Sequence, residues 1–172
     1  GGSASRPTVE FLARGSYPFL VWGNGWQNHL PADRIAGLYY DYHKLDRLYA
    51  QSAFSLHDHH EDMRKYGFVA EKIYDILASG GFAVCHQNPG IQPIFGDTVP
   101  QFSSAQELQE IFRKYAPGTR EREYAKSRGE EIALTHTWQK RGRTLSQHME
   151  KAFDWEKVNE EIRAMVLEYS LT

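Results

Sequence analysis

Two charged side chains near the middle of the chain have the types and the spacing to bind a phosphorylated ligand. Lys72 and Asp75 lie three positions apart, within residues 66–90, which read YGFVAEKIYDILASGGFAVCHQNPG. An ammonium group can neutralise a diphosphate, and a carboxylate can accept hydrogen bonds from both hydroxyls of a ribose diol. The same spacing is that of a surface ion pair on a helix, which contributes a few tenths of a kcal/mol. The spacing alone favours neither interpretation.

A helix is expected to position these two side chains. From Val69 onward, apolar residues recur at spacings of four, seven and eight, which predicts one buried stripe, formed by Val69, Ile73, Ile76 and Leu77. Lys72, Asp75 and Ser79 share a different face of that helix. The two glycines at 80 and 81 predict its end, and residues 82–85, FAVC, predict a strand buried on both faces of a parallel sheet.

A dense polar cluster, HDHHED, follows a strand predicted at residues 53–56. Its histidines and carboxylates suggest a metal site, but adjacent side chains point in different directions, and no histidine pair recurs at helical spacing. An exposed loop that starts a helix is favoured instead, and we expect no bound metal. Because open α/β sheets bind ligands at the carboxyl ends of their strands, His57 and Asp58 are also candidates for ligand contact.

A second candidate loop, GNGW, follows a strand predicted at residues 19–22. A glycine directly after a strand lets the backbone approach a ligand, although close packing or a tight turn explains Gly23 equally well. Tyr40 has a ring that could stack on a base, as do Tyr39 and Trp26, but aromatic residues at such spacing more often belong to a core. Gly23 and Tyr40 therefore stay candidates for contact with a ligand.

Short strands and helices alternate along the first two thirds of the chain. Beyond the central unit, we expect helices at residues 7–14, 42–51 and 89–95 and strands at 19–22, 36–40, 53–56 and 99–102. This order predicts an α/β fold with a parallel sheet and helices on both faces. The C-terminal third is predicted to be helical, with helix starts marked by the capping box of Ser104 and Glu107 and by the caps Thr119, Thr137 and Asp154.

Composition limits the classes of function. The 172 residues suit one domain or part of a two-domain protein, and a net charge of −2 gives no footprint for nucleic acid. No apolar run approaches the ~20 residues that cross a bilayer. Cys85 is the only cysteine, so we expect no disulfide and a reducing, cytoplasmic location. Residues 1–5, GGSAS, resemble a tag remnant or linker, which leaves residues 6–172 as a single domain.

Residues 67–81, G-F-x-x-x-K-x-Y-D-x-L-A-S-G-G, followed by a strand and N-P-G, resemble the nucleotide-sugar-binding half of GT-B glycosyltransferases. The run is most similar to the group-1-like family that includes the CgeB-type spore-maturation glycosyltransferases. Shorter segments agree in order over residues 19–150. The resemblance implies the Rossmann-like C-terminal half of a GT-B fold, whose carboxyl-end loops bind a nucleotide-diphosphate sugar without a cofactor or metal.

The resemblance also implies roles for individual positions. Lys72 and Asp75 take the places of the basic and acidic residues that precede L-A-x-G in the family. Lys72 is then expected at the diphosphate and Asp75 at the ribose. The backbone amides of Gly67 and Phe68 are expected to add hydrogen bonds to the phosphates.

Two positions depart from the family pattern. Many retaining GT-B enzymes carry two glutamates eight positions apart; Asp75 takes the second place, but Gly67 takes the first and has no carboxylate. His57 or Asp58 is a candidate substitute. Lys72 replaces the arginine of many relatives, which keeps the charge but loses the planar fork.

GT-B catalysis takes place between two domains, and the chain holds one. We therefore expect a fragment of a longer enzyme that lacks its N-terminal GT-B domain, binds the donor, and does not transfer sugar by itself to an acceptor that the sequence does not identify. The alternative is a non-catalytic α/β module, either a degenerate transferase domain or a docking scaffold. The missing acid at Gly67 favours the alternative, and the intact run over residues 67–81 favours the enzyme.

Overall fold

The computed structural model describes residues 6–15 and 17–169 of the chain. Their contacts divide it into two units, Gly1–Leu134 and Thr135–Thr172. The two units are described separately below, and the single domain expected over residues 6–172 stays a prediction. The expected tag remnant at residues 1–5 lies outside the described residues.

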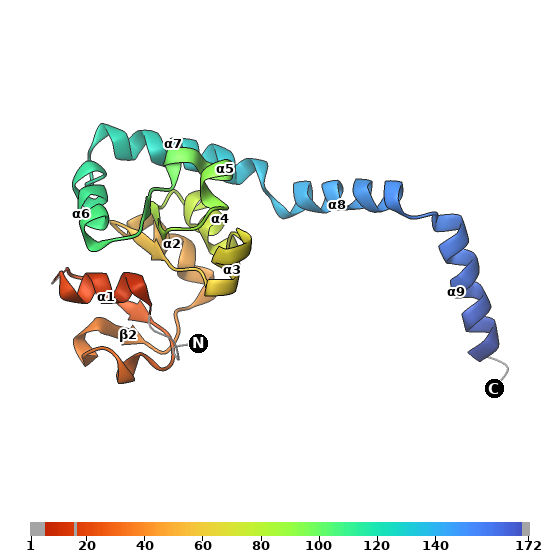
Figure 1. The fold of residues 1–172 in the computed structure, drawn as a ribbon, viewed down its shortest axis with the longest axis horizontal. Coiled ribbons are helices and arrows are strands. Elements are labelled where there is room, and N and C mark those ends of the chain that lie inside the picture. The colour runs from red at the N-terminus through yellow and green to blue at the C-terminus, as the bar shows by residue number, and fades with distance from the viewer. Residues whose placement is uncertain (1–5, 16, 170–172) are drawn as a thin grey trace. The chain divides into compact units, whose positions relative to one another are not determined.

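The first unit is an alternation of short strands and helices (Figure 1). Its strands are β1 (Val21–Trp22), β2 (Ile35–Gly37), β3 (Ser55–His57), β4 (Ala83–His86) and β5 (Gln101–Phe102). Its helices are α1 (Pro7–Arg14), α2 (Leu45–Gln51), α3 (Glu61–Tyr66), α4 (Glu71–Ala78), α5 (Ile91–Phe95), α6 (Ala105–Lys114) and α7 (Arg120–Thr135). Short 3-10 turns lie at Trp26–Asn28, Ala32–Arg34, Tyr42–Lys44 and Gly96–Thr98.

All strand pairs in this unit are parallel, which confirms the predicted α/β fold. The main sheet has the order β3-β4-β5, with Leu56 opposite Val84 and Cys85 opposite Gln101. The β1 and β2 strands pair only with each other and form a separate two-stranded sheet. Most strands are shorter than predicted, and the strand expected at residues 36–40 is Ile35–Gly37. The carboxyl ends of β3 and β4 are thereby brought side by side.

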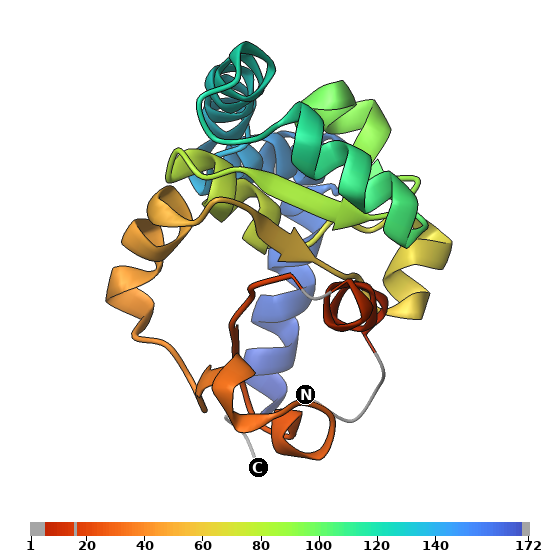
Figure 2. The same cartoon turned by 90° about the vertical axis from the view of Figure 1, so that its left-hand side faces the viewer.

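The central strand β4 buries both of its faces, as its unbroken apolar sequence predicts. One face packs Ala83 and Cys85 against α4 and α5, and the other packs Val84 and the preceding Phe82 against α1 and α6. The second of these faces is turned toward the viewer in Figure 2. Because successive side chains of a strand alternate between faces, one four-residue strand anchors two hydrophobic layers.

The turn from α4 into β4 confirms the predicted glycine stop. Gly80 adopts a left-handed conformation with φ of 69° and donates its amide to the carbonyl of Leu77. Gly81 donates to the carbonyl of Ile76 at 2.9 Å. These two bonds form a Schellman motif, which satisfies carbonyls that the helix end would leave without partners.

The second unit consists of α8 (Trp138–Ala152) and α9 (Trp155–Tyr169). Thr137 and Asp154 accept backbone hydrogen bonds from Lys140 and Lys157, which confirms both predicted caps. The apolar stripes of these helices are exposed within the described unit, at Trp138, Leu145, Met149 and Phe153 on or beside α8 and at Ile162, Met165 and Val166 on α9. Among the described residues, no helix has both the length and the apolar character to cross a membrane.

Candidate functional site

The exposed face of α4 carries Lys72 and Asp75, one helical turn apart. Both side chains are exposed, and neither forms an ion pair with another described residue. Residues three positions apart on a helix lie about 5–6 Å from each other at Cβ. The structure therefore does not use them as the surface ion pair that their spacing allows, and both charged groups are open to a ligand.

A groove of about 600 Å³ runs beside Asp75, along the contact between α2 and α4. Its lining mixes apolar and polar surface and carries three carboxylates, those of Asp46, Asp75 and Glu130, together with Tyr42, His43, Arg47 and Ser79. Burial, with the nearby negative charge of Asp75, raises the pKa of Tyr49 above its usual value, so this phenol stays protonated. The groove thus joins three carboxylates to aromatic and hydrogen-bonding side chains.

His57, at the end of β3, lies on the Lys72 side of α4. Burial, together with the neighbouring His59 and the positive charge of Lys72, lowers the pKa of His57 to about 3. Its Nε2 atom is buried and has no hydrogen-bond partner among the described residues. His57 is therefore a neutral imidazole at physiological pH, and its role as a substitute for the carboxylate missing at position 67 stays a prediction.

Asp58 makes a structural contact with the start of α1, and its expected contact with a ligand stays a prediction. Its carboxylate accepts hydrogen bonds from the backbone amide of Thr8, at 3.2 Å, and from the Thr8 hydroxyl. Thr8 lies in the first turn of α1, where amides lack partners within the helix and a negative charge is favourable. Asp58 thus ties α1 to the loop after β3, and its oxygens are already occupied.

The amides of Gly67 and Phe68 donate hydrogen bonds within the chain, and their expected role in phosphate binding stays a prediction. The Gly67 amide donates to the Arg64 carbonyl at 3.2 Å, and the Phe68 amide donates to the Met63 carbonyl at 2.8 Å. Gly67, with φ of 69°, closes α3. The Phe68 ring is 63% exposed and contributes no buried contact.

A buried histidine holds the start of α4. His59 is 6% exposed, and its Nε2 accepts a hydrogen bond of 3.1 Å from the amide of Ala70, which directly precedes α4. The proton of the neutral ring therefore resides on Nδ1, which faces the Cys85 sulfur at 3.4 Å. Burial lowers the pKa of His59, which keeps this accepting tautomer. Cys85 is fully buried, and burial raises the pKa of its thiol to about 12.

The other two predicted contacts lie in the small β1–β2 sheet. Gly23, with φ of 137°, donates its amide to the Gly37 carbonyl, and Tyr40 packs edge-on against Trp22 with ring centroids 5.3 Å apart. Neither residue lines the groove beside Asp75. A tight turn and core packing explain both positions, and their contact with a nucleotide stays a prediction.

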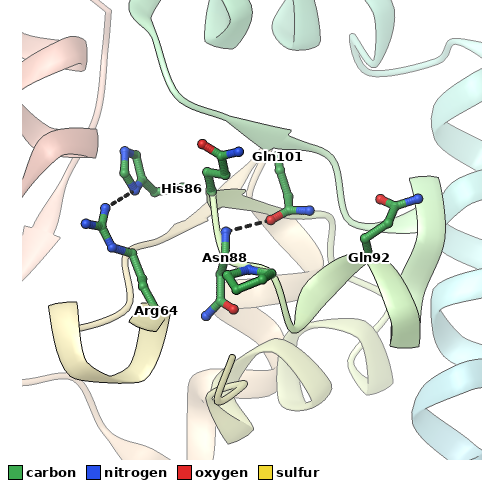
Figure 3. A pocket seen from close by; sticks show the side chains of 7 residues that line it. Arg64, His86, Asn88, Gln92 and Gln101 are labelled. Atoms are coloured by element: carbon green, nitrogen blue, oxygen red, sulfur yellow. Dashed lines mark hydrogen bonds between the residues drawn. The ribbon is translucent and has the colours of Figure 1, made fainter. Parts of the chain in front are cut away.

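A polar pocket of about 490 Å³ opens at the carboxyl ends of β4 and β5, and sequence analysis missed it. Figure 3 shows Arg64 and His86 on one side, Gln92 on the other, and Asn88 with Gln101 between them. Arg64 donates to His86 Nδ1 at 3.0 Å, and the Asn88 amide donates to Gln101 Oε1 at 2.7 Å. The sequence does contain a signal for this pocket, because polar residues continue from His86, the last residue of β4, through Gln87 and Asn88. His57 is a candidate for the same reason, since it also lies at the carboxyl end of a strand.

A metal site is not formed by the polar cluster at residues 57–62. Within residues 6–15 and 17–169, no group of three or more histidine, cysteine, aspartate or glutamate side chains gathers in a way that could hold a metal ion. Three of its members are engaged within the chain: His57 and His59 are turned inward, and Asp58 binds Thr8. Asp58 and His59 thus join the loop after β3 to α1 and to the start of α4.

Comparison with known proteins gives one match. The model of a family described as glycosyl transferase-like matches residues 5–147, which is most of the chain. No curated protein and no solved structure matches it significantly. The parallel α/β fold agrees with the Rossmann-like half of a GT-B enzyme. The chain therefore belongs to the glycosyl transferase-like family, as a GT-B-like glycosyltransferase domain.

Proposed function

We propose that this chain is the donor-binding domain of a glycosyltransferase that moves a sugar from a nucleotide-diphosphate sugar to an acceptor. The observation that carries the proposal is the exposed face of α4, where Lys72 and Asp75 lie one turn apart beside a groove and without an ion partner among the described residues. Membership of the glycosyl transferase-like family supports a role in glycosyl transfer.

Each part of the donor has a matching group along α4. Lys72, in the first helical turn, supplies a positive charge for the diphosphate, where the helix dipole also favours negative charge. Asp75 accepts hydrogen bonds from the ribose hydroxyls. The groove beside Asp75 then receives the base, with Tyr42 and Arg47 as candidates for stacking and hydrogen bonding. Its volume of about 600 Å³ lies in the range of small-ligand pockets.

The test is calorimetric titration of the chain with UDP, GDP, ADP and CMP. We expect one diphosphate to bind selectively. Asp75→Asn should weaken it roughly 10- to 100-fold, since hydrogen bonds to a charged group contribute about 1.5–3 kcal/mol. Lys72→Gln should weaken the diphosphate more than the nucleoside with the same base, because only the diphosphate carries the charge that Lys72 neutralises.

Glu71→Gln is the matched control for Asp75→Asn, because it removes one exposed negative charge from the position one helical turn before Asp75 on the same helix. It should leave binding within about twofold of the parent chain. Equal losses of affinity in Glu71→Gln and Asp75→Asn would mean that binding depends on the net charge of α4 and not on hydrogen bonds to the Asp75 carboxylate. Absence of binding to all four nucleotides would refute the donor site.

The second candidate function is a non-catalytic module that keeps the nucleotide site. It is favoured by the lack of a free carboxylate near the sugar: position 67 is glycine, and Asp58 is engaged by Thr8. Transferase assays separate the two. We expect no turnover from the isolated chain and turnover from a protein that also carries the other GT-B domain, whereas a degenerate module is inactive in both. The narrower CgeB-type assignment stays a prediction.

A further inference from the structure

We propose that the pocket at the carboxyl ends of β4 and β5 binds a monosaccharide that carries one acidic group, with Arg64 at the acid and the amide side chains at the hydroxyls. The pocket is separate from the face of α4 assigned to the nucleotide, since neither Lys72 nor Asp75 lines it. That this sugar is the acceptor rests on the proposed function. The pocket and its ligand class rest on the geometry below.

The cation in the pocket, Arg64, has no acidic partner in the part of the chain that the structure describes. Arg64 is half-buried, and its guanidinium forms no ion pair with any described carboxylate. Its one hydrogen bond to a side chain among these residues goes to the Nδ1 atom of His86, at 3.0 Å. Since a guanidinium has five N–H donors, most of them stay available to a ligand. A neutral imidazole orients the guanidinium without cancelling its charge.

The charge of the pocket selects a singly acidic ligand. The lining contains no aspartate or glutamate, and Arg64 is its one fully charged side chain. Burial lowers the pKa of His86, and its Nδ1 accepts from Arg64, so the ring is neutral. One arginine presents a planar fork to one carboxylate or phosphate. A polyphosphate or a nucleic acid would need further cations, which this lining does not supply.

The remaining lining suits sugar hydroxyls. Gln87, Gln92 and Gln101 carry amides that can both donate and accept hydrogen bonds. The amide of Gln101 is oriented, because its Oε1 accepts from the backbone of Asn88 at 2.7 Å, which leaves its NH₂ group as a donor. Asn88 is itself fixed: fully buried, it donates to the Phe68 carbonyl and accepts from the Gly90 amide.

The size and position of the pocket agree with this ligand. A volume of about 490 Å³ exceeds that of a monosaccharide but lies in the usual range for small-molecule sites. The carboxyl ends of parallel strands are the edge at which open α/β sheets bind ligands. An acidic sugar held there would lie on the same edge of the sheet as the start of α4, near the proposed diphosphate.

The experiment is a ligand-observed NMR titration with glucuronate, glucose 1-phosphate and glucose. We expect glucuronate or glucose 1-phosphate to bind at least tenfold more tightly than glucose; whichever binds identifies the acid as a carboxylate or a phosphate. Arg64→Gln should weaken that ligand at least tenfold. Lys65→Gln, which removes the same charge from the next, exposed position of α3, should leave binding unchanged. Circular dichroism spectra of both variants would show that the fold is kept.

UDP, GDP, ADP and CMP are titrated into the same variants. Nucleotide binding that is kept in Arg64→Gln while acidic-sugar binding is lost supports two separate sites. If no nucleotide binds but an acidic sugar binds through Arg64, the proposed donor site fails and the acidic-sugar pocket stands. Acidic sugars that bind no better than glucose, or equally to the parent and Arg64→Gln, overturn the pocket. Loss of nucleotide binding in Arg64→Gln would overturn its separation from the donor site.

Discussion

Among the loops at the carboxyl ends of β3 and β4, Gly90→Ala should be the change from glycine to alanine that lowers the stability of the fold most. Gly90 has φ of −76° and ψ of −15°, a conformation open to any residue, so its backbone does not require glycine. The neighbouring atoms do require glycine, because they leave no room for a Cβ. A Cβ at this position would lie 2.8 Å from the carbonyl carbon of Gly67, with the carbonyl oxygen closer still, and 3.1 Å from Cγ2 of Val69.

The cost follows from how far these atoms must move. Carbon atoms pack best at about 3.5–4.0 Å, so the two loops would have to separate by roughly 1 Å. Asn88 opposes that motion, because its hydrogen bonds tie the Gly90 loop to Phe68, the residue after Gly67. Overpacking in a fixed environment costs about 1–3 kcal/mol, and the contact here is with backbone. We expect about 3 kcal/mol for Gly90→Ala.

Urea unfolding followed by far-UV circular dichroism measures this loss. For a slope near 2 kcal/mol per molar urea, the midpoint should fall by about 1.5 M. Gly80→Ala is the matched control: φ there is 69°, but a Cβ would meet nothing within 4 Å, so it should cost only the ~1–2 kcal/mol of left-handed backbone. If Gly90→Ala destabilises the protein no more than Gly80→Ala, the contact between the two loops does not limit stability.

Two further predictions concern stability. The pKa of His57 is about 3 in the folded protein and about 6.5 in the unfolded chain, so acid protonates the unfolded chain first and favours unfolding. The protein should therefore lose about 2 kcal/mol of stability between pH 7 and pH 5. Urea midpoints at the two pH values measure this loss, and His57→Leu should reduce it. Arg122, 5% exposed, lies over the Phe82 ring at 4.8 Å and donates to the carbonyls of Tyr115 and Ser52. Arg122→Met should cost about 3 kcal/mol and Arg122→Lys less, as measured by thermal unfolding; equal losses would contradict a role for the charge.

Local signals in the sequence predicted the frame of the fold well. The stripe of α4, the glycine stop after it and the caps at Thr137 and Asp154 all depend on residues within a few positions of each other. Such short-range rules act before tertiary contacts form and can be read directly from spacing. The capping box of Ser104 and Glu107 is confirmed with one shift: the Glu107 carboxylate bonds to Ser103 rather than back to Ser104.

The site was harder to predict, because its members come from distant segments. Asp58 meets Thr8 across 50 positions, and Cys85 meets His59 across 26. Spacing cannot show that a carboxylate is already engaged, or that a histidine accepts from the start of a helix. Arg64 was passed over for the same reason, since its role depends on His86, which lies 22 positions away. The apolar stripes of α8 and α9 show the opposite difference. Their spacing is typical of a buried helix face, but their side chains are exposed in the part of the chain that the structure describes.

The rate at which a thiol reagent labels the buried Cys85 measures how often the fold opens. Thiol reagents attack the thiolate, so a fully buried cysteine with a pKa of about 12 reacts only when the central strand opens. As the only cysteine in the chain, it gives a single labelling rate, without mutation or added dye. When closing is fast, a ligand that binds only the closed form slows labelling by the factor 1 + [L]/Kd, so a concentration of 100 Kd slows it about 100-fold. Labelling rates could thus rank nucleotides and acidic sugars in a multiwell plate before any calorimetry is done.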